Sequence, residues 1–128
     1  MTKPTVVSLF SGAGGMDLGF IKAGYRVIWA NDFQKDAVTT YQKNIGNHIV
    51  QGDITKITKE QLPKEPVDVV LGGFPCQGFS VANTKRSMED KRNFLYLELL
   101  RVVKELQPKF FVAENVPGIL NRKYDQIS

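Results

Sequence analysis

The alternation of short apolar runs with segments of helical periodicity constrains the fold of this chain more than any other feature. Short runs rich in Val, Ile and Leu that end at polar or Gly-rich turns are typical of buried strands. Strands that alternate with helices form a mainly parallel sheet through right-handed crossovers, with helices on both faces. The expected strands cover residues 6–10, 26–31, 48–51, 67–71 and 109–113, and the expected helical segments cover 16–23, 35–44, 58–62 and 91–106. The sequence therefore predicts an α/β fold with a doubly wound sheet, and a long loop over 73–90.

Length and composition predict one ordinary globular domain. A chain of 128 residues has room for one core, and its 42% hydrophobic and 23% charged residues are usual for globular proteins. No apolar run reaches the roughly 18–20 residues that cross a membrane, and the N-terminus lacks the apolar stretch of a signal peptide. We therefore expect a cytoplasmic protein without a membrane partner.

Charge and cysteine content narrow the classes of site. The net charge of +4, from 17 basic and 13 acidic residues, is compatible with a polyanionic partner. The basic residues form no single block, however, so on charge alone solvated faces explain them better. Cys76 is the single cysteine, so neither an intrachain disulfide nor a cysteine zinc cluster can form. The sequence indicates no metal site.

Polar or Gly-rich residues follow each of the expected strands. In open parallel sheets, ligands bind outside the carboxyl ends of the strands, so this is where site residues are expected. The segments are 11–15, 31–32, 52–53, 72–76 and 114–115. Five successive strand ends with such chemistry predict a binding site at one edge of the sheet.

The first three of these segments suggest a cofactor that contains adenosine. The Gly-rich turn 11–15 lets backbone approach a ligand at a helix N-terminus, although a plain tight turn explains it as well. Asp32 can accept hydrogen bonds from ribose hydroxyls, and Phe33 can pack on an adenine ring. Asp53 can accept from an adenine amino group, or it can simply form a turn. These residues do not separate a dinucleotide from S-adenosylmethionine, but no phosphate-binding loop motif is present.

Cys76 stands in an unusual context for a cysteine. A lone cysteine is most often a small buried hydrophobe. This one follows Pro75 at an expected strand end, in a polar and Gly-rich segment where a thiolate can be exposed and activated. The context favours a nucleophile over a packing residue.

Glu114 directly follows an apolar expected strand. Partial desolvation there would raise the pKa of the carboxyl group and suit it to proton donation. A carboxylate that forms a salt bridge or interacts with a helix dipole is an equally good interpretation. Asn115 and Pro117 suggest a fixed turn.

Taken together, three motifs resemble those of the DNA cytosine carbon-5 methyltransferase family. They are the cofactor motif at 10–15, the Pro-Cys-Gln motif at 74–80 and the Glu-Asn-Val motif at 114–116. Their order and spacing also match, and the resemblance covers nearly the whole chain. It implies the Rossmann-like, doubly wound sheet of S-adenosylmethionine-dependent methyltransferases, with about five strands in a truncated form.

The resemblance implies a role for each cofactor residue. Asp32 would bind the ribose of S-adenosylmethionine, Phe33 would stack on the adenine, and Asp53 with Ile54 would contact the adenine edge. Phe74 and Pro75 also belong to the implied cofactor site. The methionine part would be held by Phe10, Ser11, Gly12, Ala13, Gly14 and Gly15. The product would be S-adenosyl-L-homocysteine.

The resemblance also implies the catalytic residues. Cys76 would be the nucleophile, with Gln77 beside it, and Glu114 and Asn115 would bind the target base. Arg92 would belong to the family's mobile catalytic loop. The family usually has Gly after that Arg, whereas Asn93 follows here, so the flexibility of the loop is less certain.

The family's later motifs are not found in this sequence. They include an Arg-containing catalytic motif, a target-recognition region and a final cofactor segment. The last expected strand would also form an exposed apolar edge, which invites pairing. We therefore expect a single partial catalytic domain over 1–128 without a target-recognition domain: a fragment, a truncated gene product, or one subunit of a split enzyme whose second polypeptide supplies the later motifs. The resemblance implies double-stranded DNA as the partner, in a bacterial restriction-modification system associated with the nucleoid.

Three alternatives remain open. The chain can be a binding module that holds the cofactor or a partner without turnover. It can belong to the RNA-modifying branch, although that branch more often has Pro-Pro-Cys-Gln and here Phe74 precedes Pro75. A dehydrogenase is disfavoured by the Pro-Cys-Gln segment.

Overall fold

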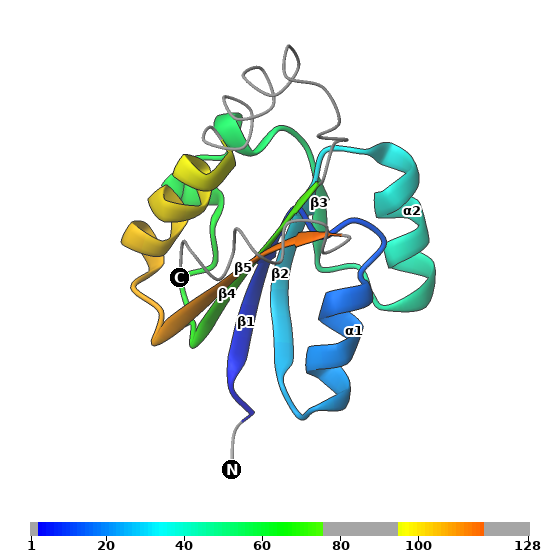
Figure 1. Ribbon diagram of the computed structural model, residues 1–128, viewed down its shortest axis with the longest axis horizontal. Coiled ribbons are helices and arrows are strands. Elements are labelled where there is room, and N and C mark those ends of the chain that lie inside the picture. The colour runs from blue at the N-terminus through cyan, green and yellow to red at the C-terminus, as the bar shows by residue number, and fades with distance from the viewer. Residues whose placement is uncertain (1–2, 76–94, 117–128) are drawn as a thin grey trace.

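The computed structural model describes residues 3–75 and 95–116, and its centre is a five-stranded parallel sheet (Figure 1). The strand order is β3-β2-β1-β4-β5, and every adjacent pair is parallel. The strands are β1 (Thr5–Leu9), β2 (Arg26–Asp32), β3 (Ile49–Gln51), β4 (Val69–Pro75) and β5 (Phe110–Val116). The chain winds outward from β1 to β3 and then returns to the other side of β1, which confirms the predicted doubly wound α/β fold.

Helices cover both faces of the sheet, as the alternating pattern predicts (Figure 1). On one face lie α1 (Gly15–Lys22) and α2 (Lys35–Asn44). On the other lie a helix whose described part covers 95–106 and two short 3-10 turns, η1 (Ile54–Lys56) and η2 (Lys59–Gln61). The sequence predicted η2 as a helical turn but did not predict η1.

The central strand β1 is buried along its whole length and supplies apolar side chains to both layers. Val7 and Leu9 join the cluster that includes Leu99 and Val102 of the 95–106 helix. Val6 joins the cluster against which α1 packs. A fully buried Val or Leu contributes roughly 1.5–3 kcal/mol, so β1 anchors both sides of the sheet.

Two strands extend beyond their predicted ends. The prediction ended the fourth strand at residue 71 and the fifth at residue 113, but β4 continues to Pro75 and β5 to Val116. The expected loop therefore begins later than residue 73. The two extensions pair with each other: Gly73 pairs with Glu114, and Pro75 with Val116. Beyond Gly72 the strand has no pairing with β1, so a proline fits there as it does in an edge strand.

Gly72 shows why this strand was underestimated. Glycine usually weakens a strand interior, which made the segment resemble a loop. Here a Cβ atom at Gly72 would lie 3.0 Å from Cδ1 of Leu99, so the small residue allows close approach of the 95–106 helix. The glycine serves packing between the sheet and the helix.

Among the described strands, β5 pairs only with β4, which leaves it at the edge of the sheet. Phe110 and Phe111 are 48% and 40% exposed on this strand, so the expected apolar edge is present in the described part of the chain. No helix within the ranges 3–75 and 95–116 is long and apolar enough to span a membrane.

Candidate functional site

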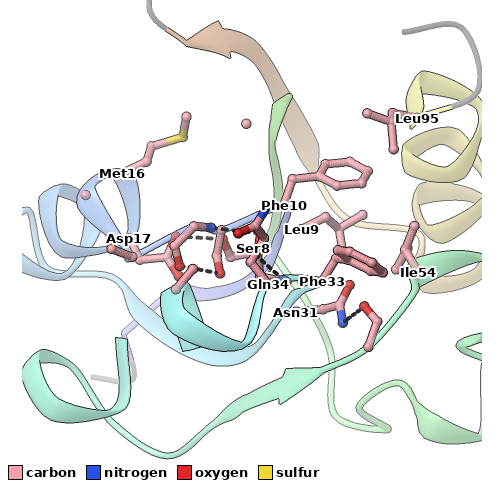
Figure 2. A pocket seen from close by; sticks show the side chains of 18 of the residues that line it. Ser8, Leu9, Phe10, Met16, Asp17, Asn31, Phe33, Gln34, Ile54 and Leu95 are labelled. Carbon is pink, nitrogen blue, oxygen red and sulfur yellow. Dashed lines mark hydrogen bonds between the residues drawn. The ribbon is translucent and has the colours of Figure 1, made fainter. Parts of the chain in front are cut away.

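A cavity of about 710 Å³ opens at the carboxyl ends of β1, β2 and β3 (Figure 2). It lies beside the point where the chain reverses across β1, the usual ligand position in such sheets. Gly73 of β4 and Leu95 of the 95–106 helix complete its wall. The predicted cofactor residues that line it are Phe10, Ser11, Gly12, Ala13, Gly15, Asp32, Phe33, Asp53 and Ile54. The cavity therefore brings together residues from three separate segments that were predicted because they lie at strand ends.

The Gly-rich turn between β1 and α1 forms one wall of the cavity. Gly12 and Gly14 have φ angles of 58° and 99°, a left-handed backbone that favours glycine. The Ser11 N–H donates to the Asn31 carbonyl at 3.2 Å, and the Gly14 N–H donates to the Ser11 carbonyl at 3.1 Å. Gly14 does not line the cavity; it is buried on the side of the turn that faces away from the cavity, close to Tyr41.

Asp32 at the end of β2 holds two backbone segments in place. Its Oδ1 accepts from the Gly12 N–H at 3.1 Å, and its Oδ2 accepts from the Gln34 N–H at 3.0 Å. A carboxylate has about four lone-pair sites, so both oxygens keep capacity for a ligand. Asp32 therefore links the Gly-rich turn to the start of α2 and still presents acceptors to the cavity.

An apolar end of the cavity can receive a flat ring. Phe33, Ile54 and Leu95 lie toward one end in Figure 2, and Met16 and Asp17 lie toward the other. The Phe33 side chain is 70% exposed, whereas Ile54 is buried. An exposed aromatic face at a cavity wall offers a stacking surface.

Asp53 stands at the rim as the N-cap of η1. Its Oδ1 accepts from the Thr55 N–H at 2.9 Å and from the Thr55 hydroxyl at 2.7 Å. These bonds lower the pKa of Asp53, so the group stays an ionised acceptor near neutral pH.

Arg101 fixes the backbone next to this rim, and the sequence analysis missed it. Its Nη2 donates to the Ile54 carbonyl at 2.9 Å and to Glu98 at 2.8 Å, and its Nη1 donates to Glu105 at 3.1 Å. Burial opposes the charge, but the bonds to the two carboxylates outweigh it and raise the pKa of Arg101. The i,i+3 and i,i+4 spacing of the acidic residues was the available signal.

Replacing Arg101 with methionine is expected to lower the free energy of unfolding by about 2 kcal/mol, because it leaves a backbone carbonyl and two carboxylates without their shared donor. The matched control is Arg26→Met. Among the residues that the structure describes, Glu65 is the one ion-pair partner of Arg26. Both side chains are about half exposed, and such surface pairs contribute roughly 0–1 kcal/mol. Urea unfolding of both variants measures the difference. Equal losses would show that Arg101 is only another surface ion pair.

A buried polar network lies behind the Gly-rich turn, and nothing in the sequence pattern pointed to it. Asp17 accepts from the Ser8 hydroxyl at 2.6 Å and from the Tyr41 hydroxyl at 2.5 Å, and the Tyr41 oxygen lies 2.7 Å from Nε2 of His48. Burial raises the pKa of Asp17 against the effect of its two hydrogen bonds, and burial lowers the pKa of His48. Asp17 was predicted only as part of a short helix.

The predicted catalytic residues are described only in part. Glu114 and Asn115 lie in β5, paired with Gly73 and Phe74 of β4, and nothing is described of their side chains or of those of Phe74 and Pro75. Glu114 is therefore a strand residue rather than one that follows the strand. Cys76, Gln77 and Arg92 lie outside the described residues. Since Gly73 lines the cavity, the backbone at Glu114 belongs to the strand beside it.

Comparison with known proteins identifies close relatives of this sequence. Residues 4–127 match the family model of C-5 cytosine-specific DNA methylase. The chain is 49% identical over 118 residues to the type II methyltransferase M.NgoFVII of Neisseria gonorrhoeae, which covers 92% of this chain and 32% of the relative. It is 47% identical over 118 residues to M.FnuDI of Fusobacterium nucleatum, with 92% and 34% covered. The chain thus spans about a third of the length of these relatives.

Solved structures show the same fold. A DNA modification methyltransferase encoded within a prophage of Escherichia coli matches with a TM-score of 0.69 and 39% identity, over 98% of this chain and 35% of that one. The Dnmt2 methyltransferase of Schizosaccharomyces pombe matches with a TM-score of 0.67 and 23% identity, over 97% and 37%. Within the described ranges, no three His, Cys, Asp or Glu side chains are grouped as a metal site requires.

Proposed function

Since this chain belongs to the C-5 cytosine-specific DNA methylase family, we propose that it takes part in methyl transfer from S-adenosylmethionine to carbon-5 of cytosine in DNA. The observation that carries the proposal is the cavity at the carboxyl ends of β1, β2 and β3, next to the strand that leads to Cys76. The relatives of this chain are type II methyltransferases, which supports a role in restriction and modification within a bacterial cytoplasm.

The residues of the cavity fit the two halves of this cofactor. The exposed ring of Phe33 and the buried side chain of Ile54 suit an adenine, and the carboxylates of Asp32 and Asp53 suit the ribose hydroxyls and the adenine amino group. The Gly-rich turn allows backbone to approach the methionine half closely. A volume of about 710 Å³ lies within the usual range of small-molecule sites. When bound, the cofactor supplies an electrophilic methyl group.

The proposed chemistry depends on Cys76, because carbon-5 of cytosine is too weak a nucleophile to take a methyl group directly. The Cys76 thiolate forms a bond to carbon-6, and the ring electrons shift so that carbon-5 becomes nucleophilic. Glu114 donates a hydrogen bond or a proton to ring nitrogen 3 and stabilises the charge that the attack creates. After methylation carbon-5 loses its proton, the bond from sulfur to carbon-6 breaks and the thiolate is released.

The target base must leave the duplex for this reaction. Carbon-6 is inaccessible in a stacked helix, and extruding a nucleotide costs a few kcal/mol. We propose that Asn115 and Gln77 help to hold the extruded base, and that Arg92 acts from a loop near it. The catalytic and target-recognition residues that are not found in this sequence would come from further polypeptide. The exposed Phe110 and Phe111 of β5 are consistent with such an addition to the sheet.

Asp32→Ala is expected to weaken binding of S-adenosylhomocysteine by about 10- to 100-fold, because it removes a charged acceptor and frees the Gly12 amide. Isothermal titration calorimetry measures the affinity. The matched control is Asp36→Ala, which removes an exposed carboxylate from α2 outside the cavity lining. Unchanged affinity in Asp32→Ala would remove this residue from the proposed ribose site.

Covalent trapping tests the proposed reaction. The chain is incubated with labelled S-adenosylmethionine and DNA that contains 5-fluorocytosine, with and without a co-expressed polypeptide that carries the family's later motifs. Fluorine takes the place of the carbon-5 hydrogen and cannot be removed as a proton, so the bond from sulfur to carbon-6 does not break and an active enzyme stays attached to DNA. We expect trapping only with the added polypeptide. Trapping by the chain alone would show that it needs no partner, and no trapping in either sample would favour a binding module. A parallel pair of samples with RNA that contains 5-fluorocytosine tests the RNA-modifying branch, which trapping only on RNA would favour.

A further inference from the structure

Tyr41 of α2 contacts the Gly-rich turn from behind. Its side chain is fully buried, although it carries a hydroxyl group. A Cβ atom built on Gly14 would lie 2.8 Å from Cδ2 of Tyr41, so the ring lies directly against the backbone of the turn. Ile45, one helical turn later, fills the rest of this space. The shape of the turn at Gly14 is therefore set from the side opposite the cavity.

The Tyr41 hydroxyl is held in one orientation by its neighbours. It donates to Oδ2 of Asp17, and His48 lies on its other side, so the Nε2–H tautomer of His48 can donate to the tyrosine oxygen. The second oxygen of Asp17 accepts from the Ser8 hydroxyl of β1. The network thus joins β1, α1, α2 and the segment before β3. Ser8, Asp17 and His48 are the polar groups that face Tyr41 directly or through Asp17.

Asp17 carries this constraint into the cofactor cavity. It lies in the first turn of α1, directly after the Gly-rich turn, and is fully buried although it belongs to the cavity wall. The Leu18 N–H donates to the Gly14 carbonyl at 2.8 Å, so the start of the helix and the turn move together. A buried carboxylate without a donor is strongly disfavoured, which ties the start of α1 to Tyr41.

We propose that Tyr41, acting through Gly14 and Asp17, is a positioning residue that shapes the Gly-rich turn for the methionine half of the cofactor. This inference rests on the proposed function. The inference concerns only the methionine half of the ligand, because Tyr41 contacts the turn at Gly14. Neither Tyr41 nor His48 lines the cavity, so neither contacts the end at Phe33 and Ile54 that suits the adenine.

Tyr41→Phe in the full chain tests the inference, because it removes the hydroxyl and keeps the ring. Calorimetry with two probes, S-adenosylhomocysteine and adenosine, separates the two halves of the site. We expect the affinity for S-adenosylhomocysteine to fall about 10-fold, and the affinity for adenosine to change by less than about 2-fold. The matched control is Tyr25→Phe, since Tyr25 lies against Phe20 outside the cavity lining and should leave both affinities unchanged.

Two further measurements test whether the change in affinity comes from the turn and its hydrogen bonds. Ser8→Ala removes the other donor to Asp17 and should shift the two affinities in the same pattern. Hydrogen exchange of the ligand-free chain should show faster exchange of the Gly14 and Leu18 amides in Tyr41→Phe than in the unaltered chain.

The outcomes distinguish this inference from the proposed function. Equal loss of affinity for both probes would mean that Tyr41 only supports the fold and would overturn the inference. If the unaltered chain binds S-adenosylhomocysteine and Tyr41→Phe binds it with the same affinity, the inference is overturned but the proposed function is not. Failure of the unaltered chain to bind S-adenosylhomocysteine would overturn the proposed function, and the inference with it.

Discussion

Replacing Cys76 with alanine is expected to abolish covalent capture on DNA that contains 5-fluorocytosine and to lower methyl transfer by on the order of 10⁴-fold or more, the scale on which loss of a covalent nucleophile acts. Cys76 is the single cysteine of the chain, so no other thiol of this polypeptide can replace it. The measurement is a denaturing gel of the chain with the added polypeptide and labelled DNA, on which the slow covalent band should disappear. Transfer of labelled methyl groups to ordinary DNA gives the rate.

The control for this variant is cofactor affinity. The proposed site for S-adenosylhomocysteine is built from β1, β2 and β3, so Cys76→Ala should bind it within about 2-fold of the unaltered chain. Cys76→Ser keeps the size of the side chain but offers a far weaker nucleophile, and it should also fail to form the band. A covalent band that persists in Cys76→Ala would show that another group attacks the base.

Gly14→Ala is expected to destabilise the fold by about 2–4 kcal/mol and to remove measurable cofactor binding. The backbone at Gly14 has a φ angle of 99°, which alanine rarely adopts. The new Cβ atom would also lie 2.3 Å from Cδ1 of Ile45 and 2.8 Å from the Tyr41 ring. Neither side chain can move away easily, because both lie in the packed contact of α2 with the sheet. Thermal unfolding and calorimetry measure the two effects.

Gly19→Ala is the matched control, in the helix α1 for which Gly14 is the N-cap. A Cβ atom at Gly19 meets nothing within 4 Å, and the residue is exposed in α1. Alanine is a better helix former than glycine by about 1 kcal/mol, so this variant should be slightly more stable. If the two alanine variants had equal stability, the crowded, left-handed backbone at Gly14 would not be the constraint described above.

The parallel, doubly wound sheet and most element positions could be predicted from the sequence, because the alternation of strands and helices is a local pattern, whereas the strand order comes only from the structure. Apolar runs gave the positions of all five strands, and α2 has the predicted bounds. The ends of β4 and β5 could not be predicted. Gly73 and Glu114 resemble loop residues when each is considered alone, and only their pairing across the sheet extends both strands.

The candidate site shows the same division. Asp32, Asp53 and the Gly-rich turn were predicted because the carboxyl ends of parallel strands meet at one edge. The roles of Asp17, Tyr41 and Arg101 depend on contacts between elements far apart in the sequence, such as the bond from Arg101 to the Ile54 carbonyl. In a helix these residues resemble ordinary surface positions, because periodicity does not reveal which polar group meets a buried partner.

The central place of β1 also has a kinetic consequence. Val6 pairs with Val69, and the Thr5 amide donates to Asp68, which lies 63 residues later in the chain. During synthesis the edge of β1 that pairs with β4 therefore stays unpaired until β4 emerges much later, and such distant parallel pairings form slowly. Until then β1 has only β2 beside it, and Val7 and Leu9 lack the cover of the 95–106 helix, so this is the interval in which the nascent chain is most prone to aggregate.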